Sequence, residues 1–194
     1  PPLFFLPPTP ATPMRRSLVG SEMCIRDRVE GDRPELHKTG ANPIPSSKEH
    51  VEGEFETTGL GIPSQSNWKV SGKALVTDVP ITYLGYVNRD TGVIEEPGHP
   101  LDGESIGDTV LIYPKGSGST VAPFVLMGLM YTEMGPKVIV NRDVCPLTLP
   151  AASLLGVPYA HGFADDPTME VNSGDEVEIS LEGGVTTLKV LNRV

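Results

Sequence analysis

The sequence contains little cysteine. Its two cysteines among 194 residues are Cys24 and Cys145, and Cys24 lies within the first 28 residues, which are not expected to belong to the folded domain. A single remaining cysteine cannot form an intramolecular disulfide, and an iron–sulfur cluster or a structural zinc site needs about four ligands. We therefore expect the chain itself to bind no cofactor and no metal, and a reducing, cytoplasmic compartment is the default.

Long apolar runs and basic residues are also scarce. No segment approaches the roughly 18 apolar residues of a membrane-spanning helix, although 38% hydrophobic residues suffice for a folded core. The 15 Lys and Arg residues are outnumbered by 25 Asp and Glu residues, which gives a net charge of −10. Because binding to nucleic acids or anionic membranes relies on positive charge, the composition argues against both kinds of partner.

Glycine and proline, in contrast, are abundant. The chain has 21 Gly and 20 Pro residues, so turns and short elements should outnumber long helices. This composition excludes a coiled coil and a helical bundle.

The first 28 residues show neither helical nor strand periodicity and do not start with Met. Their segment SLVGSEMCIRDR (17–28) resembles translated sequencing-adapter read-through. A secretory signal is the competing interpretation, but the basic residues Arg15 and Arg16 follow the short apolar stretch 3–6 instead of preceding it. We therefore expect residues 1–28 to be an artefact, which leaves the true start of the protein open. Removing their four arginines and two acidic residues leaves a net charge of −12.

Residues 29–67 are polar and carry few large apolar side chains. Such a segment buries too little surface to offset the entropy lost on ordering, so we expect a mobile polar leader. The folded domain is expected to span residues 68–194 and to begin near Trp68.

The pattern of residues 68–194 predicts an α/β domain. Mostly buried helices are expected at 121–134 and 147–155, and extended runs at 68–70, 73–77, 80–87, 109–113, 137–140 and 157–160. Alternating residues at 176–181 and 185–191 flank Gly183 and Gly184, which predicts a hairpin whose turn needs positive φ. We expect a sandwich of short sheets with two helices, not a symmetric Rossmann sheet.

The clearest chemical feature is the segment YPKGSGST (113–120), between a buried strand and a buried helix. Glycines let a backbone approach a ligand closely, and the N–H groups and dipole at the start of a helix favour an anion such as carboxylate or phosphate. Ser119 is expected at the mouth of this helix. The alternative is that Ser119 or Thr120 only caps the helix. Neither a Walker A frame nor the Gly-x-Ser-x-Gly frame of a hydrolase elbow occurs here.

Isolated histidines and Cys145 are weaker signals. His99, in the segment GHPL, is a candidate base or carboxylate anchor, with a hydrogen-bonded loop residue as the alternative. His161 carries the same ambiguity. Cys145 is expected to be a small buried hydrophobic residue, because no base neighbours it in the sequence. No His, Cys and carboxylate residues show metal-binding spacing, so no metal site is expected.

Six short segments occur in a characteristic order: GKALV (72–76), TGVI (91–94), HPLDGES (99–105), PKGSGS (114–119), GP (135–136) and GVP (156–158). Together they resemble the small swivelling domain of the aconitase X family, over about residues 68–194. Each segment alone is weak, but their order and spacing are fairly specific. The chain departs from the family pattern at Pro123, where many members carry Ser or Gly.

The resemblance implies a swivelling β/β/α fold that closes over a large catalytic subunit or domain holding a 4Fe-4S cluster. It implies dehydration of a hydroxy acid, such as phosphomevalonate in isoprenoid biosynthesis, with cis-3-hydroxyproline as the alternative substrate. The serine base of the family motif maps onto Ser119. Substrate contacts are expected at His99, Lys115, Gly116, Ser117, Gly118 and Thr120. Whether the large part is a separate chain stays open.

A second class of function is a non-catalytic module on the same fold, whose anion-binding loop holds a ligand or docks a partner. Within the first class, a phosphorylated substrate would favour a cation near the loop. Lys115 and Arg142 are the candidates, with solvated surface charges as the alternative.

Overall fold

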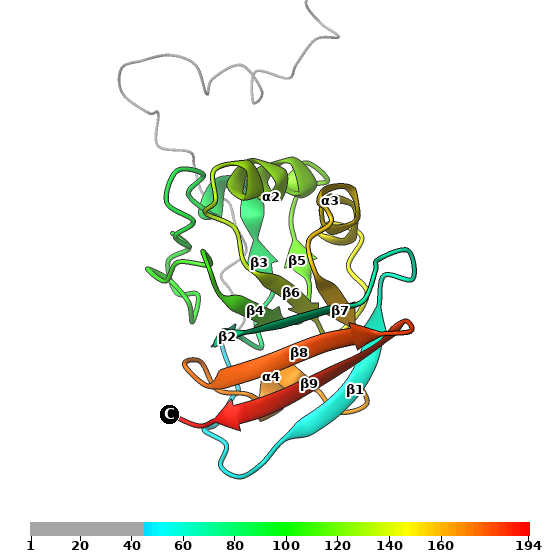
Figure 1. Cartoon of the computed structure of the whole chain (residues 1–194). Helices are drawn as coiled ribbons and strands as arrows, with labels where there is room; N and C mark the ends of the chain where they lie inside the picture. Colours follow the sequence, from blue (N-terminus) through cyan, green and yellow to red (C-terminus); the bar gives the residue numbers. More distant parts are fainter. Residues whose placement is uncertain (1–44) are drawn as a thin grey trace, which may run out of the picture. The chain divides into compact units, whose positions relative to one another are not determined.

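The structure, a computed structural model, describes residues 45–194. Within this range, seven strands form a closed barrel in the order β1-β7-β6-β4-β2-β8-β9 (Figure 1). The strands are β1 (Glu56–Gly61), β2 (Trp68–Val76), β4 (Val110–Tyr113), β6 (Val138–Asn141), β7 (Tyr159–His161), β8 (Glu176–Glu182) and β9 (Val185–Asn192). A separate two-stranded sheet pairs β3 (Ile81–Thr82) with β5 (Gly116–Ser117).

Two helices of more than one turn cover part of the barrel. Figure 1 shows α2 and α3 above the strands β4, β6 and β7, with β8 and β9 on the side of the barrel away from them. The helices of residues 45–194 are α1 (Tyr83–Tyr86), α2 (Ala122–Tyr131), α3 (Leu149–Leu155) and α4 (Pro167–Glu170). Since α1 and α4 have four residues each, α2 and α3 provide the helical layer.

The barrel has a parallel half and an antiparallel half. Strands β2, β4, β6 and β7 run parallel to one another, whereas β8, β9 and β1 close the barrel through antiparallel pairs. Strands β4 and β6 are buried along their whole length, as expected for parallel strands covered on both faces. The carboxyl ends of β4, β6 and β7 therefore meet at one edge of the barrel.

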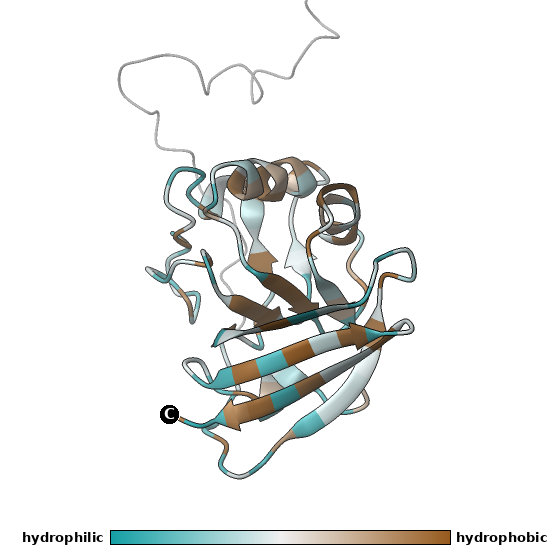
Figure 2. Cartoon of the chain, viewed as in Figure 1, coloured by the Kyte–Doolittle hydropathy of each residue, from teal (hydrophilic) through white to brown (hydrophobic). Residues whose placement is uncertain are grey.

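Side chains of the barrel strands point alternately inward and outward. On β4, Val110 and Ile112 belong to the core inside the barrel, whereas Leu111 and Tyr113 belong to the core beneath α2 and α3. Figure 2 shows the same contrast in hydropathy: β8 and β9 alternate between hydrophobic and hydrophilic residues, while β4 and β6 are continuously hydrophobic. The alternation on β8 and β9 leaves one face for the barrel core and one for solvent.

The structure confirms the α/β class and the main expected elements. The runs at 109–113 and 137–140 correspond to β4 and β6, and the helical stretches at 121–134 and 147–155 contain α2 and α3. Strands β8 and β9 form the expected hairpin, and the turn glycines Gly183 and Gly184 both have positive φ, 58° and 88°. Within 80–87 the regular strand is limited to β3, while Leu84 and Val87 keep extended backbone angles within and after α1.

The expected leader requires a correction. Residues 56–61 of the supposed mobile segment form β1, which pairs with β9 and β7 and closes the barrel. Upstream of β1, the backbone N–H and Oγ of Ser47 both donate to the carboxylate of Asp78, at 2.7 and 3.1 Å. Residues 29–44 of the leader and the expected artefact at 1–28 lie outside the described residues. Among residues 45–194, no helix combines the length and apolar character needed to cross a membrane.

Candidate functional site

The segment 113–120 lies where the chain leaves β4 and enters α2. The register pairs Tyr113 of β4 with Asn141 of β6, and Asn141 with His161 of β7, so the three parallel strands end at the same level. Ligand sites in α/β sheets characteristically lie beyond the carboxyl ends of such strands. The fold therefore places the glycine-rich loop in a position suited to ligand binding.

The outer part of this loop is held by β3. The N–H of Ile81 donates to the carbonyl of Lys115 at 3.3 Å, and Thr82 Oγ1 and Ser117 Oγ share a hydrogen bond of 2.6 Å. Gly118 has φ +84°, and a Cβ at this position would lie 3.0 Å from Cγ2 of Thr82. A side chain at Gly118 would therefore strain the backbone and crowd Thr82.

Beneath the loop, buried groups fix its inner side. The N–H of Gly116 donates to Cys145 Sγ at 3.2 Å, and the N–H of Cys145 donates to the hydroxyl of Tyr159 at 3.0 Å. Asn141 Nδ2 donates to the carbonyl of Tyr113 at 3.2 Å. Cys145 is fully enclosed at 1% exposure, in agreement with the expected buried hydrophobic residue.

Two buried tyrosines complete the floor of the site. The hydroxyls of Tyr83 and Tyr113 are hydrogen-bonded at 2.7 Å, and their rings meet edge to face. Burial raises the pKa of both phenols well above the ordinary value, so both stay neutral at physiological pH. This pair ties β4 to the segment that follows β3, at the base of the loop.

Ser119 is half-buried at the start of α2. Its Oγ accepts a hydrogen bond from the N–H of Val121 at 3.2 Å, and its carbonyl accepts from Ala122 at 3.0 Å. The residue at the helix N-cap is Val121, whose side chain makes no cap hydrogen bond. Ser119 thus turns the chain two residues before the cap, and its Oγ lies close to the positive end of the α2 dipole. Both features favour negative charge on Oγ or on a nearby anion.

The other predicted loop residues belong to the same segment as Ser119, whereas His99 lies beside Val79 and Pro80, just before β3. Lys115, Gly118 and Thr120 are exposed, Ser117 is half-buried and Gly116 is buried. His99 is 4% exposed, and its Nδ1 accepts from the N–H of Leu101 at 3.0 Å.

Burial lowers the pKa of His99, and the nearby backbone groups of Val79 and Pro80 partly oppose this shift. None of these partners belongs to segment 113–120. His99 is thus a buried loop residue with one hydrogen-bonded ring nitrogen, and its Nε2 has no partner within residues 45–194; its role in substrate binding stays a prediction.

Thr82 and Arg142 also contact the loop. The importance of Thr82 escaped the sequence analysis, because its contact with Ser117 joins residues 35 positions apart and no local pattern marks it. Arg142, one of the two cation candidates, lies beside the loop, since its N–H donates to the carbonyl of Tyr113 at 3.3 Å. Its guanidinium is already paired with Asp143 at 3.3 Å and Asp166 at 3.6 Å. Lys115 is the more available cation, because it is exposed and forms no salt bridge within residues 45–194.

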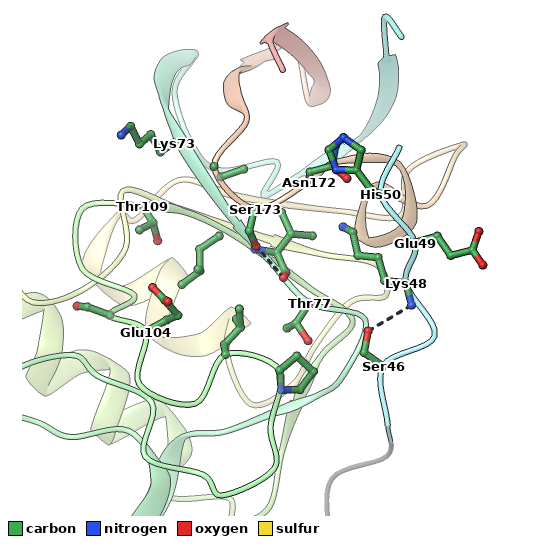
Figure 3. Close-up of a pocket in the computed structure, with 17 residues that line it drawn as sticks. Ser46, Lys48, Glu49, His50, Lys73, Thr77, Glu104, Thr109, Asn172 and Ser173 are labelled. Atoms are coloured by element: carbon green, nitrogen blue, oxygen red, sulfur yellow. Dashed lines mark hydrogen bonds between the residues drawn. The ribbon is translucent and has the colours of Figure 1, made fainter. Parts of the chain in front are cut away.

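An open cavity of about 640 Å³ lies elsewhere on the molecule. Figure 3 shows that its lining includes Ser46, Lys48 and His50 from the segment before β1, with Lys73, Thr77 and Glu104 on other walls. None of the lining residues belongs to segment 113–120. The cavity is therefore separate from the Ser119 loop.

Lys48 anchors one wall of this cavity. Its Nζ donates to the carbonyl of Thr168 at 2.8 Å and to that of Val171. Burial lowers the pKa of Lys48 to about 8, although the carboxylates of Asp78 and Asp175 favour its charged form. The segment before β1 is thereby attached to α4.

Comparisons with known proteins agree on one family. The family model described as the aconitase X swivel domain matches residues 63–188. The phosphomevalonate dehydratase small subunit of Methanocella arvoryzae is 33% identical over 120 residues, which is 62% of this chain and 91% of the relative. The corresponding small subunit of Pyrococcus horikoshii is 37% identical over 89 residues, which is 46% of this chain and 66% of the relative.

Two solved structures share the fold. The crystal structure of Thermococcus kodakaraensis aconitase X in its holo-form superposes with a TM-score of 0.61 at 24% identity, covering 69% of this chain and 98% of that chain. The solution structure of a UPF0107 protein superposes with a TM-score of 0.58 at 28% identity, covering 68% and 97%.

Proposed function

Because the chain belongs to the aconitase X swivel domain family, we propose that it is the small component of a dehydratase in which Ser119 is the base. Its relatives are named as small subunits, which supports a larger catalytic partner. The observation that carries the residue assignment is the placement of Ser119. Ser119 is half-buried on the loop that follows the carboxyl end of β4, this loop is fixed from two sides, and Ser119 Oγ accepts a backbone N–H at the start of α2.

The proposed reaction removes water from a hydroxy acid. Ser119 Oγ takes the proton from the carbon next to the substrate carboxylate, and the electron pair of that C–H bond forms the new double bond. The hydroxyl group leaves the adjacent carbon with its bonding electrons and departs as water after protonation. Two bonds to carbon break and one double bond forms, so the step needs no oxidant or reductant.

A free serine is too weak a base for this step. The N–H of Val121 and the N-terminus of α2 stabilise an alkoxide at Oγ, because they present positive charge where negative charge develops. The remaining stabilisation has to come from the partner, as does assistance to the departing hydroxyl. An exposed loop of this kind becomes a closed site only when another surface covers it.

We place the 4Fe-4S cluster of the resemblance in the partner, because the described part of this chain does not fit one. Cys145 is buried and its Sγ accepts a hydrogen bond from Gly116. No three His, Cys, Asp or Glu side chains of residues 45–194 are grouped so that they could hold a metal ion. No step in the proposed reaction is therefore assigned to a cluster on this chain.

The proposed substrate is phosphomevalonate, with cis-3-hydroxyproline as the alternative. The names of the relatives support the first, and the exposed Lys115 beside the glycine loop can pair with a phosphate. Replacing Lys115 with Met should raise the KM for phosphomevalonate and leave any turnover of cis-3-hydroxyproline unchanged. If the wild type and Lys115→Met had equal KM values for phosphomevalonate, Lys115 would not contact the phosphate.

Ser119→Ala in the complex with the large subunit tests the base assignment. We expect kcat to fall by a factor of about 100 or more, in the range of lost acid–base catalysis, while assembly persists. Ser105→Ala is the matched control, because Ser105 Oγ also accepts an N–H two residues on, from Gly107 at 3.2 Å. Ser105→Ala should lower the melting temperature at least as much as Ser119→Ala, because Ser105 Oγ also donates to the carbonyl of Thr91 at 3.1 Å, yet the Ser105 variant should keep its turnover. Full activity of Ser119→Ala would end the catalytic assignment.

A second candidate function is a non-catalytic module that binds an anion or docks a partner. The hydrogen bond from the N–H of Val121 to Ser119 Oγ favours this function, because it gives Ser119 a structural role in the turn. The same bond is what a purely structural turn would form. Under this alternative, Ser119→Asp is tolerated because an Asp carboxylate accepts a backbone N–H two residues on as readily as a Ser hydroxyl does. In the catalytic case the added charge repels the substrate carboxylate, so substrate affinity falls more for Ser119→Asp than for Ser119→Ala.

A further inference from the structure

An apolar surface begins next to Ser119 and runs along the outside of α2. It consists of Val121, Phe124 and Tyr131, which are 39%, 69% and 75% exposed, and of Leu154 on α3, which is 75% exposed. We call these four residues the docking face. Positions 121, 124 and 131 lie on one side of a helix because they are separated by three and seven residues. Helix α3 packs beside α2 in the same layer (Figure 1).

The composition of α2 indicates that this side of the helix is covered in the working protein. Its sequence APFVLMGLMY contains no charged residue, and a helix that is apolar all round is normally buried all round. In this chain one side is buried through Val125, Leu126 and Leu129, while Figure 2 shows the hydrophobic colour around the outside of α2 as well.

The rest of the surface shows what a solvated face of this chain looks like. On the antiparallel side of the barrel, charged residues separate the exposed apolar ones: Lys69 pairs with Glu178 and Lys189 with Glu56, while the exposed Val185 and Leu191 of β9 stand apart, with Lys189 between them. Contiguous exposed apolar residues, in contrast, mark interaction sites. Aromatic side chains are enriched at the centres of protein interfaces, where charged residues are depleted.

The position of the docking face identifies its occupant. Val121 is two residues from Ser119, so a protein that brings a substrate within reach of Ser119 Oγ also comes up to the first turn of α2. From there the helix continues for ten residues, or about 15 Å at 1.5 Å per residue. A membrane is a poor occupant, because α2 carries no Lys or Arg and the chain has a net charge of −10.

We propose that the docking face binds the large subunit of the dehydratase, through an apolar partner surface without unpaired buried charge. This inference rests on the proposed function, since it takes the direction of the partner from Ser119. Phe124 and Tyr131 supply most of the binding, because large aromatic side chains at the centre of an interface dominate its affinity. Leu154 extends the contact onto α3.

Phe124→Glu and Tyr131→Glu test the proposal by titration against the phosphomevalonate dehydratase large subunit from the same genome. Each variant should raise the Kd at least tenfold and keep its melting temperature, because the side chains are exposed. Turnover should recover when the large subunit is saturating. Leu191→Glu is the matched control, because Leu191 is 48% exposed on β9, a strand on the other side of the barrel (Figure 1). The Kd of the Leu191→Glu variant for the large subunit should equal that of the wild type.

The outcomes separate this proposal from the proposed function. Ser119→Ala should keep the wild-type Kd for the large subunit and lose turnover. Phe124→Glu should bind the large subunit more weakly and keep its turnover once the large subunit is saturating. An active Ser119→Ala with weak binding by Phe124→Glu would remove the base assignment and keep the docking face.

Unchanged Kd values in both docking-face variants, or no binding by the wild-type chain, overturn the proposal. So does a wild-type dimer that Phe124→Glu converts to a monomer without affecting the large subunit's Kd, because a second copy would then occupy the face. Co-sedimentation of the wild-type chain with anionic phospholipid vesicles that Phe124→Glu abolishes, again at unchanged Kd, would assign the face to a membrane and overturn it equally.

Discussion

Gly118 allows the geometry of the loop to be tested without altering Ser119. Its φ is +84°, a region that costs a non-glycine residue about 1–2 kcal/mol. An added Cβ would also lie 3.0 Å from Cγ2 of Thr82, a side chain held by its hydrogen bond to Ser117. We expect Gly118→Ala to lower the free energy of unfolding by about 1–2 kcal/mol through the backbone alone, or about 2–8 °C in Tm for a domain of this size.

Turnover should suffer more than stability. The new Cβ can be relieved only by moving the loop or Thr82, and Ser119 follows Gly118 directly. A displacement of about 1 Å in a reacting group costs about 100-fold in rate, so the kcat of the assembled enzyme should fall by about 10- to 100-fold. Gly103→Ala is the matched control, since Gly103 has φ +90° and no atom within 4 Å of its Cβ position. The Tm of Gly103→Ala should fall by a similar amount, and its kcat should equal that of the wild type.

A second substitution separates backbone strain from the contact. Thr82→Ser removes the methyl group that the new Cβ would meet and keeps the hydroxyl that binds Ser117. The double variant Gly118→Ala with Thr82→Ser should therefore recover part of the kcat while its Tm stays low. Thermal melts and steady-state kinetics on the complex provide both measurements. If Gly118→Ala kept full turnover and its Tm fell only as much as that of Gly103→Ala, the loop geometry would not determine the position of Ser119. That result would refute the reasoning.

Two further predictions concern stability. Burial lowers the pKa of Lys48 to about 8 from 10.5, so the unfolded chain binds more protons between these values and the free energy of unfolding should rise from pH 8 toward pH 10. Urea titrations should show this rise in the wild type, and the rise should be absent from Lys48→Met. Above pH 10 the free energy of unfolding should fall again, because burial raises the pKa of Tyr83, Tyr113 and Tyr159 in the folded chain. A chain beginning at residue 62 should melt at a lower temperature than one beginning at residue 45, since β7 and β9 both lose β1; equal melting curves would contradict a structural role for β1.

The elements that the sequence predicted well are those determined by neighbouring residues. Strand β4 follows from a continuous apolar run, because such a run suits a parallel strand covered on both faces. Helix α3 ends at Gly156, which takes the left-handed conformation with φ 68° that a glycine stop predicts. The hairpin turn at Gly183 and Gly184 is local in the same sense.

Strand β1 could not be predicted, because its burial depends on residues far away in the chain. Its inward positions are Thr57, Gly59 and Gly61, none of which is large and apolar. A Cβ at Gly59 would lie 2.9 Å from the ring of Phe163, and one at Gly61 would lie 2.5 Å from Leu181. The side chains that fill the space around β1 therefore belong to other segments, and the sequence of β1 alone resembles a polar leader.

The candidate site divides in the same way. Ser119 and the glycines around it were identified from a local pattern, since a glycine-rich loop between a strand and a helix is continuous in sequence. Thr82 and Cys145 hold that loop from positions about 30 residues away on either side, through contacts with Ser117 and Gly116. Only the pairing of β3 with β5 and the packing beneath the loop bring these residues together.

The way the loop is held limits how the site can open. Ser119 is flanked by a strand pairing on one side and by the first turn of α2 on the other. The hydrogen bond between Tyr83 and Tyr113 fixes the base of the loop in the core. Moving Ser119 alone would break several of these interactions at once, whereas moving the whole domain breaks none of them. If the proposed function holds, we therefore expect a substrate to reach Ser119 through displacement of the whole domain relative to its partner, with the loop moving as part of a rigid body.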